Sequence, residues 1–230
     1  MLRAIIGLSA NRNELAHYKL NDDATTKTLA DSSGNDYDLT RAVENSEDRT
    51  VTGKVNTAQS FTTVGEYACR TPLTNGASGA IMAWCNLTAG TTGQTLISQR
   101  IAGIENIDYQ IATADVAGNI KFRGTFDSVS KEIATSTPPS GTFHVAVIWS
   151  AGTCTMYING SSVGSFTYTS YTPAEAVGAM FCIGGRNYNT GLQLDGWLDD
   201  VRVYNTTIEE SDLVKIYNSG SGTESKLEEL

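Results

Sequence analysis

One loop of the sequence carries the oxygen-bearing side chains that a hard metal ion requires. It runs from Asp31 to Asn35 and reads DSSGN. Calcium takes about six to eight oxygen ligands, usually carboxylates, amide oxygens and backbone carbonyls of turns. The loop offers this mixture and so indicates a structural calcium site. The same residues also form an ordinary turn in which the aspartate binds its own backbone, and both interpretations stay open.

Two tyrosines stand beside polar residues in the way that sugar-binding sites require. Tyr188 shares a loop with Arg186, Asn187 and Asn189, and Tyr109 directly follows an aspartate. An aromatic ring can cover the apolar face of a sugar while amide, carboxylate or guanidinium groups bind its hydroxyls. These five residues are therefore candidate ligand-binding residues. The alternative is an ordinary Gly/Asn loop with a packing tyrosine.

No group of residues has the spacing of a catalytic site. The acidic clusters at 44–48 and 209–210 fall in a predicted loop and at a predicted helix start, where carboxylates are usually solvated. A serine or cysteine nucleophile needs a neighbouring base. The two histidines, His17 and His144, lie in apolar strand patterns that are typical of structural histidines. We therefore predict no catalytic residues.

The four cysteines give little support to a metal or redox site. Cys69, Cys85, Cys154 and Cys182 show no CxxC spacing. Each lies in an apolar, strand-like context, which favours a small buried side chain. A disulfide between two cysteines that face each other is the alternative.

Charge and length exclude several classes of partner. The 230-residue chain has 16 Lys and Arg against 25 Asp and Glu, a formal net charge of -9. This charge opposes binding to nucleic acid and to anionic membranes. No apolar run approaches the roughly 18 residues of a spanning helix, and Met1–Ala10 has too small an apolar core for a signal peptide. We expect no nucleic acid, no membrane insertion, and synthesis in the cytoplasm without a signal peptide.

Short apolar runs recur at roughly ten-residue spacing with turn residues between them, which is typical of an antiparallel β-sandwich. The predicted strands are Leu15–Leu20, Gly79–Asn86, Thr95–Arg100, Asp108–Thr113, Asn119–Gly124, His144–Ser150, Cys154–Ile158, Gly164–Tyr168, Met180–Ile183 and Gly196–Tyr204. The dipeptide Asn159-Gly160 predicts a tight hairpin between two of them. In the last strand, period-two alternation places Asp199 on one face with Val201 and Val203, which is costly unless the acid is paired.

A single segment has helical periodicity. Between Thr207 and Tyr217, Thr207 is the expected N-cap, and Leu213, Ile216 and Tyr217 form an apolar stripe that should lie against the sandwich. No linker rich in proline or glycine divides the chain. We expect an N-terminal arm over residues 1–13, one domain over 14–218 and a polar C-terminal tail over 219–230.

Four pieces of the chain together resemble a known family. They are LAHYKL and DSSGN at 15–20 and 31–35, AIMAW at 80–84, HVAVIW and MYING at 144–149 and 156–160, and GGR and DGWLDDVRVYN at 184–186 and 195–205. In this order they resemble the laminin G-like, concanavalin A-like jelly-roll family, which is also similar to pentraxins. The resemblance covers about residues 14–218.

The resemblance implies an all-β, two-sheet antiparallel jelly-roll sandwich with one short C-terminal helix and with the first strand close to the last. In similar domains the first loop often shares calcium with an acid of the last strand, which would join Asp31 and Asn35 to Asp199 or Asp200. Related glucanases carry Glu-x-Asp-x-x-Glu on one strand face, and this chain has no such run.

For function, the resemblance implies a non-catalytic, lectin-like domain that binds carbohydrate, as a glycan or a surface receptor. Together with the expected cytoplasmic synthesis, it suggests a surface component of a phage or virus particle. Such a component would be oligomeric, with termini that dock on other chains, and an extracellular location is the alternative. A structural decoration or fibre protein without a sugar site is the competing function, and a glycoside hydrolase is disfavoured.

Overall fold

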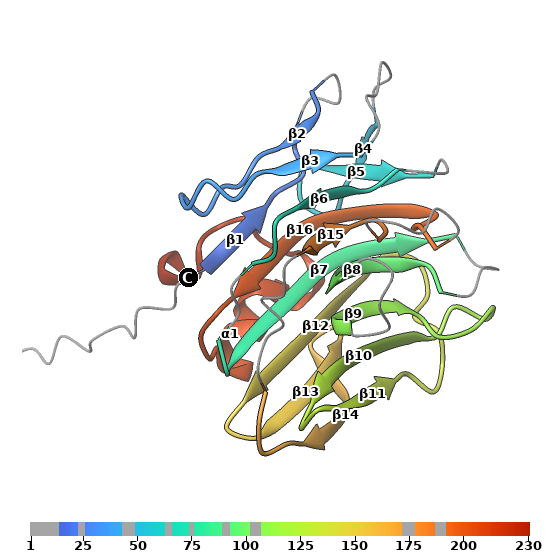
Figure 1. The fold of residues 1–230 in the computed structure, drawn as a ribbon. Coiled ribbons are helices and arrows are strands. Elements are labelled where there is room, and N and C mark those ends of the chain that lie inside the picture. Colours follow the sequence, from blue (N-terminus) through green and yellow to red (C-terminus); the bar gives the residue numbers. More distant parts are fainter. Residues whose placement is uncertain are drawn as a thin grey trace, which may run out of the picture.

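Two eight-stranded antiparallel sheets pack face to face in the computed structural model (Figure 1). The residues described are 14–22, 26–42, 49–62, 66–73, 76–88, 93–101, 107–171, 178–186 and 192–230. The predicted two-sheet antiparallel sandwich is confirmed. Within the described residues, no helix is long and apolar enough to span a membrane.

Sheet A has the strand order β14-β13-β12-β7-β16-β5-β4, and β1 also pairs with β16. Its strands are β1 (Glu14–Tyr18), β4 (Thr50–Thr52), β5 (Thr57–Phe61), β7 (Gly79–Leu87), β12 (Phe143–Ser150), β13 (Thr153–Ile158), β14 (Ser161–Thr167) and β16 (Gly196–Tyr204). The pairing of β1 with β16 is antiparallel, as expected for the first and last strands.

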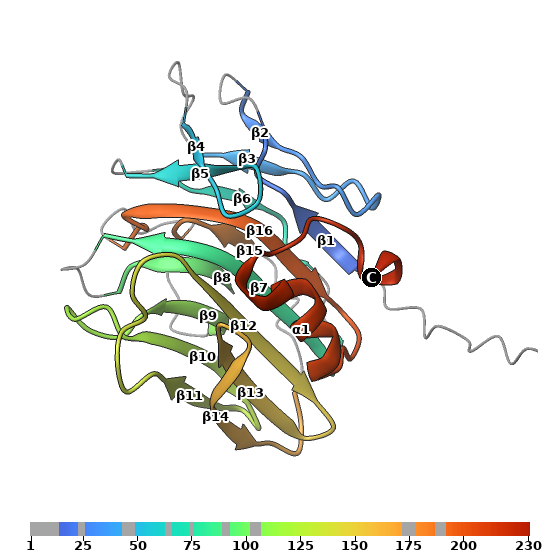
Figure 2. The same ribbon diagram turned by 180° about the vertical axis from the view of Figure 1, so that it is seen from behind.

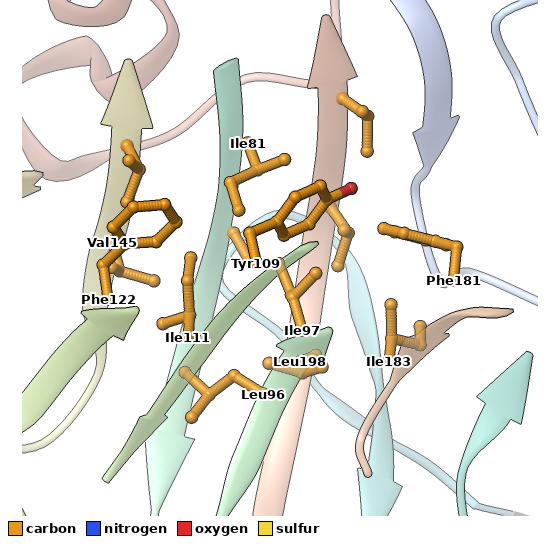
Figure 3. Packing of buried hydrophobic residues seen from close by; sticks show 14 of the residues in the cluster. Ile81, Leu96, Ile97, Tyr109, Ile111, Phe122, Val145, Phe181, Ile183 and Leu198 are labelled. Carbon is orange, nitrogen blue, oxygen red and sulfur yellow. The ribbon is translucent and has the colours of Figure 1, made fainter. Parts of the chain in front are cut away.

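Sheet B has the order β11-β10-β9-β8-β15-β6-β3-β2. Its strands are β2 (Thr28–Leu29), β3 (Leu39–Arg41), β6 (Ala68–Arg70), β8 (Thr95–Ile101), β9 (Ile107–Thr113), β10 (Ile120–Phe126), β11 (Val129–Ala134) and β15 (Ala179–Ile183). Side chains from the facing sides of the two sheets form the main core (Figure 3). Ile81 and Val145 of sheet A meet Ile97, Ile111 and Phe122 of sheet B there, because alternate residues of each strand point inward.

The Asn159-Gly160 turn is confirmed. It joins β13 to β14, with Ile158 paired to Ser161. Asn159 has φ 51° and Gly160 has φ 76°, the left-handed conformations that a two-residue hairpin turn of the primed type requires.

Strand β16 breaks its alternation at a β-bulge. Asp199 lies opposite Trp84 of β7, but Arg202 lies opposite Met82, so β16 has one residue more than β7 between these pairs. Asp200 is at the bulge and has a φ of 48°, a conformation that aspartate tolerates better than most residues. The prediction that Asp199 shares a face with Val201 is therefore wrong. The bulge keeps Val201 in the core and places Asp199 on the outer face with Trp84.

Helix α1 (Glu210–Tyr217) covers the outer face of sheet A (Figure 2). Leu213 and Ile216 are buried against Met82 and Tyr204 in a second apolar cluster, which confirms the predicted stripe. The predicted cap is wrong. The N-cap is Glu209, whose N–H donates to the Asp212 carboxylate at 3.0 Å.

The C-terminal segment, expected as a tail held by partner chains, packs on its own domain. It includes two 3₁₀ helices, η1 (Asn218–Gly220) and η2 (Leu227–Glu229). The Arg202 guanidinium donates to the backbone carbonyls of Thr223 and Ser225. Leu227 is buried in the second apolar cluster, and Lys226 Nζ donates to the Ser33 carbonyl. Contacts within one chain are therefore enough to hold residues 223–227.

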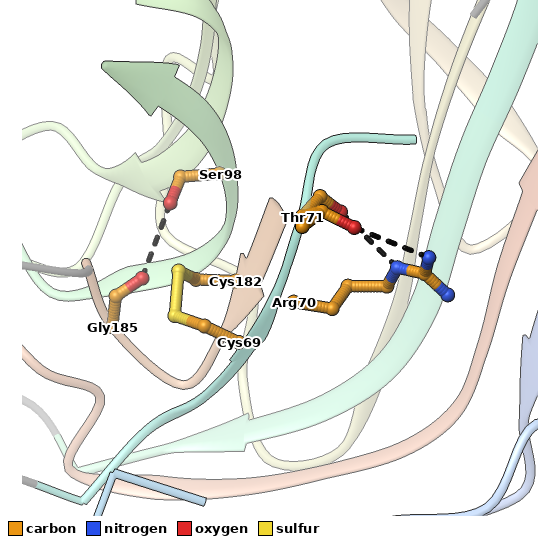
Figure 4. Close-up of a disulfide and its surroundings, with 6 residues drawn as sticks. All are labelled: Cys69, Arg70, Thr71, Ser98, Cys182 and Gly185. Atoms are coloured by element: carbon orange, nitrogen blue, oxygen red, sulfur yellow. Dashed lines mark hydrogen bonds between the residues drawn. A yellow bond between two sulfur atoms is a disulfide. The ribbon is translucent and has the colours of Figure 1, made fainter. Parts of the chain in front are cut away.

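Two of the four cysteines form a disulfide. Cys69 on β6 lies opposite Cys182 on β15, and their sulfurs are bonded (Figure 4). Cys85 and Cys154 are free and buried. The preferred interpretation, four unpaired buried thiols, is wrong for the first pair, because the register of two neighbouring strands brings these cysteines together.

Candidate functional site

The residues proposed for calcium are each engaged by other groups. Asp31 Oδ1 accepts the N–H groups of His17 and Ser33, both at 2.9 Å. Its Oδ2 accepts the Ser33 hydroxyl at 2.7 Å and the Tyr37 N–H at 3.0 Å. An ionised carboxylate offers about four acceptor sites, so these donors occupy them all. The Asn35 amide nitrogen faces carbonyls of β1, at 3.1 Å from that of Leu15, as a donor and not as a metal ligand.

The two acids of β16 serve other contacts. Asp199 Oδ2 accepts the N–H groups of Lys54 and Val55 at 2.7 and 2.8 Å. Asp200 Oδ1 lies 2.6 Å from His17 Nε2 and 3.0 Å from the Arg202 guanidinium. Among the described residues, no group of three or more His, Cys, Asp or Glu is placed to hold a metal ion. The loop and the two acids therefore do not fit a shared calcium ion.

Asp200 belongs to a buried ionic cluster between β1 and β16. His17 and Arg202 are the basic residues of this cluster, and both contact Asp200. Glu14 is its second acid, and Glu14 Oε1 accepts the Tyr204 hydroxyl at 3.0 Å. Burial lowers the pKa of His17, but hydrogen bonds to Asp200 and Glu14 outweigh it, so the pKa lies above its usual 6.5. Two acids and two bases balance in charge, which is what makes their burial tolerable. This arrangement supports a structural role for His17.

His144 is also enclosed. It is fully buried, and its ring centroid lies 5.1 Å from that of Trp84. Burial lowers the pKa of His144 to about 4. A neutral imidazole without contact to solvent is a packing residue in this position.

The predicted sugar-binding residues are not brought together among the described residues. Tyr109 is only 1% exposed and points into the core between the sheets (Figure 3), so it offers no open platform for a ligand. Its assignment as a ligand-binding residue is corrected on this ground. Arg186 follows β15 and donates to Thr95 Oγ1 at 3.2 Å and to Gln110 Oε1 at 3.0 Å. Asn187, Tyr188 and Asn189 lie outside the described residues, and their role stays a prediction.

A hollow of about 550 Å³ opens at one end of the sandwich. Four separate stretches of chain line it: the approach to β7, the β12–β13 turn, the segment after β14, and the residue that begins the approach to α1. The lining residues are Ala77, Ser78, Ser150, Ala151, Gly152, Tyr168, Thr169, Ser170, Tyr171 and Thr207. Sequence reasoning missed this site because its residues are far apart in the chain. The hydroxyl-rich stretch 168–171, with a tyrosine at each end, was the available signal.

Aromatic packing supports the inner side of the hollow. Tyr171 stacks on Phe126 with ring centroids 4.5 Å apart, and Tyr168 lies 4.9 Å from the same ring. Trp149 packs edge-on against Tyr171 at 5.8 Å. Because these rings join the main core, the two tyrosines are held in fixed positions.

Polar contacts fix the rim. Asp127, in the β10–β11 turn, accepts the N–H groups of Thr169 and Ser170 at 2.8 and 2.7 Å. Its second oxygen pairs with Lys131 Nζ at 2.7 Å. We call this arrangement the Asp127 clip. It ties the segment after β14 to sheet B.

The opposite rim contains a strained turn. Ala151 has a φ of 48° and is followed by Gly152 at 81°. A left-handed conformation costs a residue with a Cβ about 1–2 kcal/mol. The reason for this conformation is local, because Ala151 and Gly152 form the two-residue hairpin turn of the primed type between β12 and β13, in which Ser150 pairs with Thr153.

The hollow presents hydroxyl groups and no charged side chain among its lining residues. None of its lining residues is a carboxylate, a histidine, a lysine or an arginine. General acid–base catalysis needs a group that exchanges protons near neutral pH, and these lining side chains supply none.

Comparison with known proteins identifies the family. The family model described as the concanavalin A-like lectin/glucanases superfamily, Laminin_G_3, matches residues 61–214. No curated protein has a significant match to the chain.

Several solved structures share the fold. Domain 4 of AbnA, a GH43 extracellular arabinanase from Geobacillus stearothermophilus, in complex with arabinotriose, has a TM-score of 0.68 at 19% identity and covers 92% of this chain and 98% of that one. The binding domain of Paraclostridial Mosquitocidal Protein 1 has a TM-score of 0.65 at 16% identity, with 90% of this chain and 52% of that one covered. The Ruminococcus gnavus IT-sialidase CBM40 bound to α2,3-sialyllactose has a TM-score of 0.54 at 15% identity, with 62% and 83% covered.

The chain thus spans about half the length of the toxin binding domain and nearly all of the arabinanase domain. At these identities the likenesses concern the fold. The family model covers more than half of the chain and agrees with the two-sheet sandwich. The chain therefore belongs to the laminin G-like family of the concanavalin A-like lectin/glucanase superfamily.

Proposed function

We propose that this domain is a non-catalytic, lectin-like module that binds carbohydrate in the hollow at the end of the sandwich. The observation that carries the proposal is the lining of the hollow, in which serine and threonine hydroxyls surround the edges of two tyrosines, Tyr168 and Tyr171, that are 9% and 7% exposed. Sugars present a set of hydroxyls, and the serine and threonine hydroxyls of the hollow can donate to them and accept from them. Two proteins of the same fold, the arabinanase domain and the sialidase module, were solved with bound saccharides.

The proposal that the domain is non-catalytic rests on the positions of its acidic side chains. Glycoside hydrolysis usually needs two carboxyl groups on either side of the scissile bond. Asp199 and Asp200 are adjacent in the chain, but both are fully buried and bound to other groups. Asp108 and Asp127 reach the hollow only through the residues they hold, Tyr171, Thr169 and Ser170.

Titration calorimetry with arabinotriose and lactose tests the proposal. Ala77 is exposed on the rim, so Ala77→Trp should fill the hollow without disturbing the core, and we expect binding to fall at least tenfold. Ala117 is equally exposed on the β9–β10 turn, away from the hollow, and Ala117→Trp serves as the control. Equal binding by the two variants would exclude the hollow as the site. Failure of a broad panel of glycans to bind the wild-type protein would contradict the carbohydrate-binding function itself.

We also propose that the domain works in an oxidising setting, such as the surface of a phage or virus particle or the outside of a cell. The support is the Cys69–Cys182 disulfide, because structural disulfides persist mainly outside the reducing cytosol. Mass spectrometry of protein from its native source, alkylated without reduction, should find two modified cysteines after unfolding. Four modified cysteines would contradict this setting.

A further inference from the structure

We infer that the outer face of sheet B carries a second binding site, for the carboxylate or sulfate groups of an acidic polysaccharide. Lys121 and Arg123 of β10 provide its cationic groups, and Arg186, which follows β15, adds a third positive charge beside them. The inference rests on the proposed function only for the choice of a glycan as the anionic ligand. The site shares no residue with the hollow, so each can be tested without the other.

Strand alternation places the two cations of β10 on the outer face. The strand lies between β9 and β11 in sheet B (Figure 1). Its residues Ile120 and Phe122 belong to the main core, and Lys121 and Arg123 alternate with them and are only half-buried. Alternate residues of a strand point to the same face, with Cα atoms about 7 Å apart. One acidic chain lying along β10 can therefore contact both cations.

Neither of these cations is neutralised by a neighbouring acid. Arg123 Nε donates to the Ser130 hydroxyl at 2.7 Å. Neither Arg123 nor Lys121 forms an ion pair with a carboxylate in the part of the chain that the structure describes. In a chain with 25 Asp and Glu against 16 Lys and Arg, two adjacent cations without an acid point to a negatively charged ligand. Cations elsewhere in the domain do have carboxylate partners, as in Lys19, Arg49, Lys131, Arg202 and Lys215.

The strands beside β10 add one cation and one acid to this face. On β9, Gln110 lies opposite Arg123, and its side-chain oxygen accepts from the Arg186 guanidinium at 3.0 Å. Arg186 also donates to Thr95 Oγ1 at 3.2 Å, so these neutral groups hold the guanidinium next to β10. On β11, Glu132 lies opposite Arg123 and is exposed. Positive charge therefore exceeds negative charge at this place.

The net charge of -9 does not prevent binding of an anion here. Salt limits the interaction between exposed charges to about 8 Å at physiological ionic strength, so the charges of the same face decide. Among the outward side chains described on β9, β10 and β11, Glu132 is the one acid, because Asp108 of β9 turns inward to the Tyr171 hydroxyl. The local field is thus opposite in sign to that of the whole chain.

The number of cations favours an acidic glycan over a nucleic acid. Lysine and arginine donate charge-assisted hydrogen bonds to anionic oxygens, and these bonds are stronger than those between neutral groups. Proteins that bind nucleic acid through its backbone neutralise many phosphates with lysine and arginine. Three cations are few for that task, but they suit a glycan with one carboxylate or sulfate on each sugar.

Binding of hexagalacturonic acid tests the inference, and its fully methyl-esterified form is the neutral control of the same length and linkage. Titration calorimetry at low salt should show binding of the acid at least tenfold tighter than that of the ester. The affinity for the acid should fall as salt is added, because salt screens the charges. Sulfated maltohexaose offers sulfate groups in place of carboxylates, and the tighter of the two acidic glycans identifies the anion.

Variants locate the site. The double variant Lys121→Gln/Arg123→Gln should weaken binding of the acid at least tenfold. Lys19→Gln/Lys215→Gln removes the same net charge from two other parts of the surface and should weaken it less than twofold. Glu132→Gln removes the acid of this face and should strengthen binding several-fold. This variant and the ester control decide the matter if the first double variant fails to fold.

Two results would overturn the inference directly: equal losses in the two double variants, or equal affinity for the acid and its ester. Binding that Ala77→Trp abolishes and Lys121→Gln/Arg123→Gln does not would also overturn it, because the acid would then occupy the hollow and the proposed function would stand. Tighter binding of a six-nucleotide oligothymidylate, lost in the same double variant, would overturn the assignment to a glycan. Binding of the acid at this face, without binding of any neutral glycan, would support the inference and refute the proposed use of the hollow.

Discussion

His17 on β1 and Asp200 on β16 meet with the imidazole Nε2 2.6 Å from the carboxylate Oδ1, and both side chains are fully buried. The contact joins residues separated by 183 positions in the chain. It also depends on the bulge at Asp200, which turns this carboxylate toward β1.

Removal of His17 should destabilise the domain in a pH-dependent way. We expect His17→Ala to lower the free energy of unfolding by about 3–5 kcal/mol, because a buried pair that loses one partner leaves an uncompensated charge. The folded pKa of His17 lies above its unfolded value, so its contribution is fully present below about pH 6.5 and is lost as the pH rises through the folded pKa. Urea unfolding at pH 6 and pH 9 should show the larger loss at pH 6.

A surface pair provides the control for this prediction. Lys19 lies 3.9 Å from Glu224 with 37% of its side chain exposed. Exposed pairs contribute about 0–1 kcal/mol, so Lys19→Ala should have little effect. Equal losses in His17→Ala and Lys19→Ala, or a loss in His17→Ala that does not change with pH, would contradict the structural role of the buried cluster.

Asp199 should make the domain less stable as the pH rises from about 4 to 7. Burial raises the pKa of Asp199 to about 7, against 3.8 for an ordinary aspartate. The folded state therefore holds a proton that the unfolded state has released, and stability decreases across this interval by an amount of the order of a few kcal/mol. Asp199→Asn should reduce this slope, because its amide oxygen can still accept from Lys54 and Val55.

The measurement is the free energy of unfolding at half-unit steps between pH 4 and 8. Asp36→Asn at an exposed turn position, where φ is 58°, changes the same charge without a buried carboxylate. If Asp199→Asn and Asp36→Asn gave the same slope as the wild type, the titration of Asp199 would not contribute.

Leu227 should anchor the C-terminal segment. It is 5% exposed, whereas Leu230, three residues on, is 44% exposed. Leu227→Ala should lower stability by about 2 kcal/mol or more, because it leaves a cavity beside α1. Leu230→Ala should change stability by less than about 0.5 kcal/mol. Thermal melting of the two variants distinguishes an anchored segment from a free tail, for which both substitutions would be neutral.

Relief of the strained turn should stabilise the protein. Ala151→Gly removes the Cβ from a left-handed position, and we expect a net gain of about 0.5–1 kcal/mol after the entropy of the unfolded chain is counted. Ala117 is exposed and does not have a positive φ. Ala117→Gly should therefore be slightly destabilising. A loss of stability in Ala151→Gly would show that the alanine is not strained.

Calcium should leave the stability of the domain unchanged. The acceptor sites of Asp31 are filled by four donors, and Asp200 is paired with Arg202. A ligand that binds only the folded state raises its stability by mass action, so melting temperatures in millimolar calcium and in excess chelator should agree within about 1 °C. A rise of several degrees that Asp31→Asn abolishes would restore the calcium site expected from the family.

The sequence by itself determined the features that depend on local periodicity and turn chemistry. Alternating apolar residues predicted the antiparallel sandwich, and Asn159-Gly160 predicted the β13–β14 hairpin, because two residues suffice to set a primed turn. The stripe of Leu213 and Ile216 predicted which side of the helix is buried. Each of these signals lies within a few residues of chain, where backbone conformation is chosen by sterics and by the burial of one face.

Only the tertiary structure decided how distant residues meet. The bulge at Asp200 shifts the alternation of β16 by one residue, and register in a sheet depends on how whole strands match rather than on any one of them. The same dependence on register pairs Cys69 with Cys182 and buries Tyr109, which the sequence had offered as a ligand platform. The hollow forms because four stretches of chain, each next to a strand of sheet A, meet at one end of the sandwich. Such a surface is a product of packing, and no single stretch of sequence encodes it.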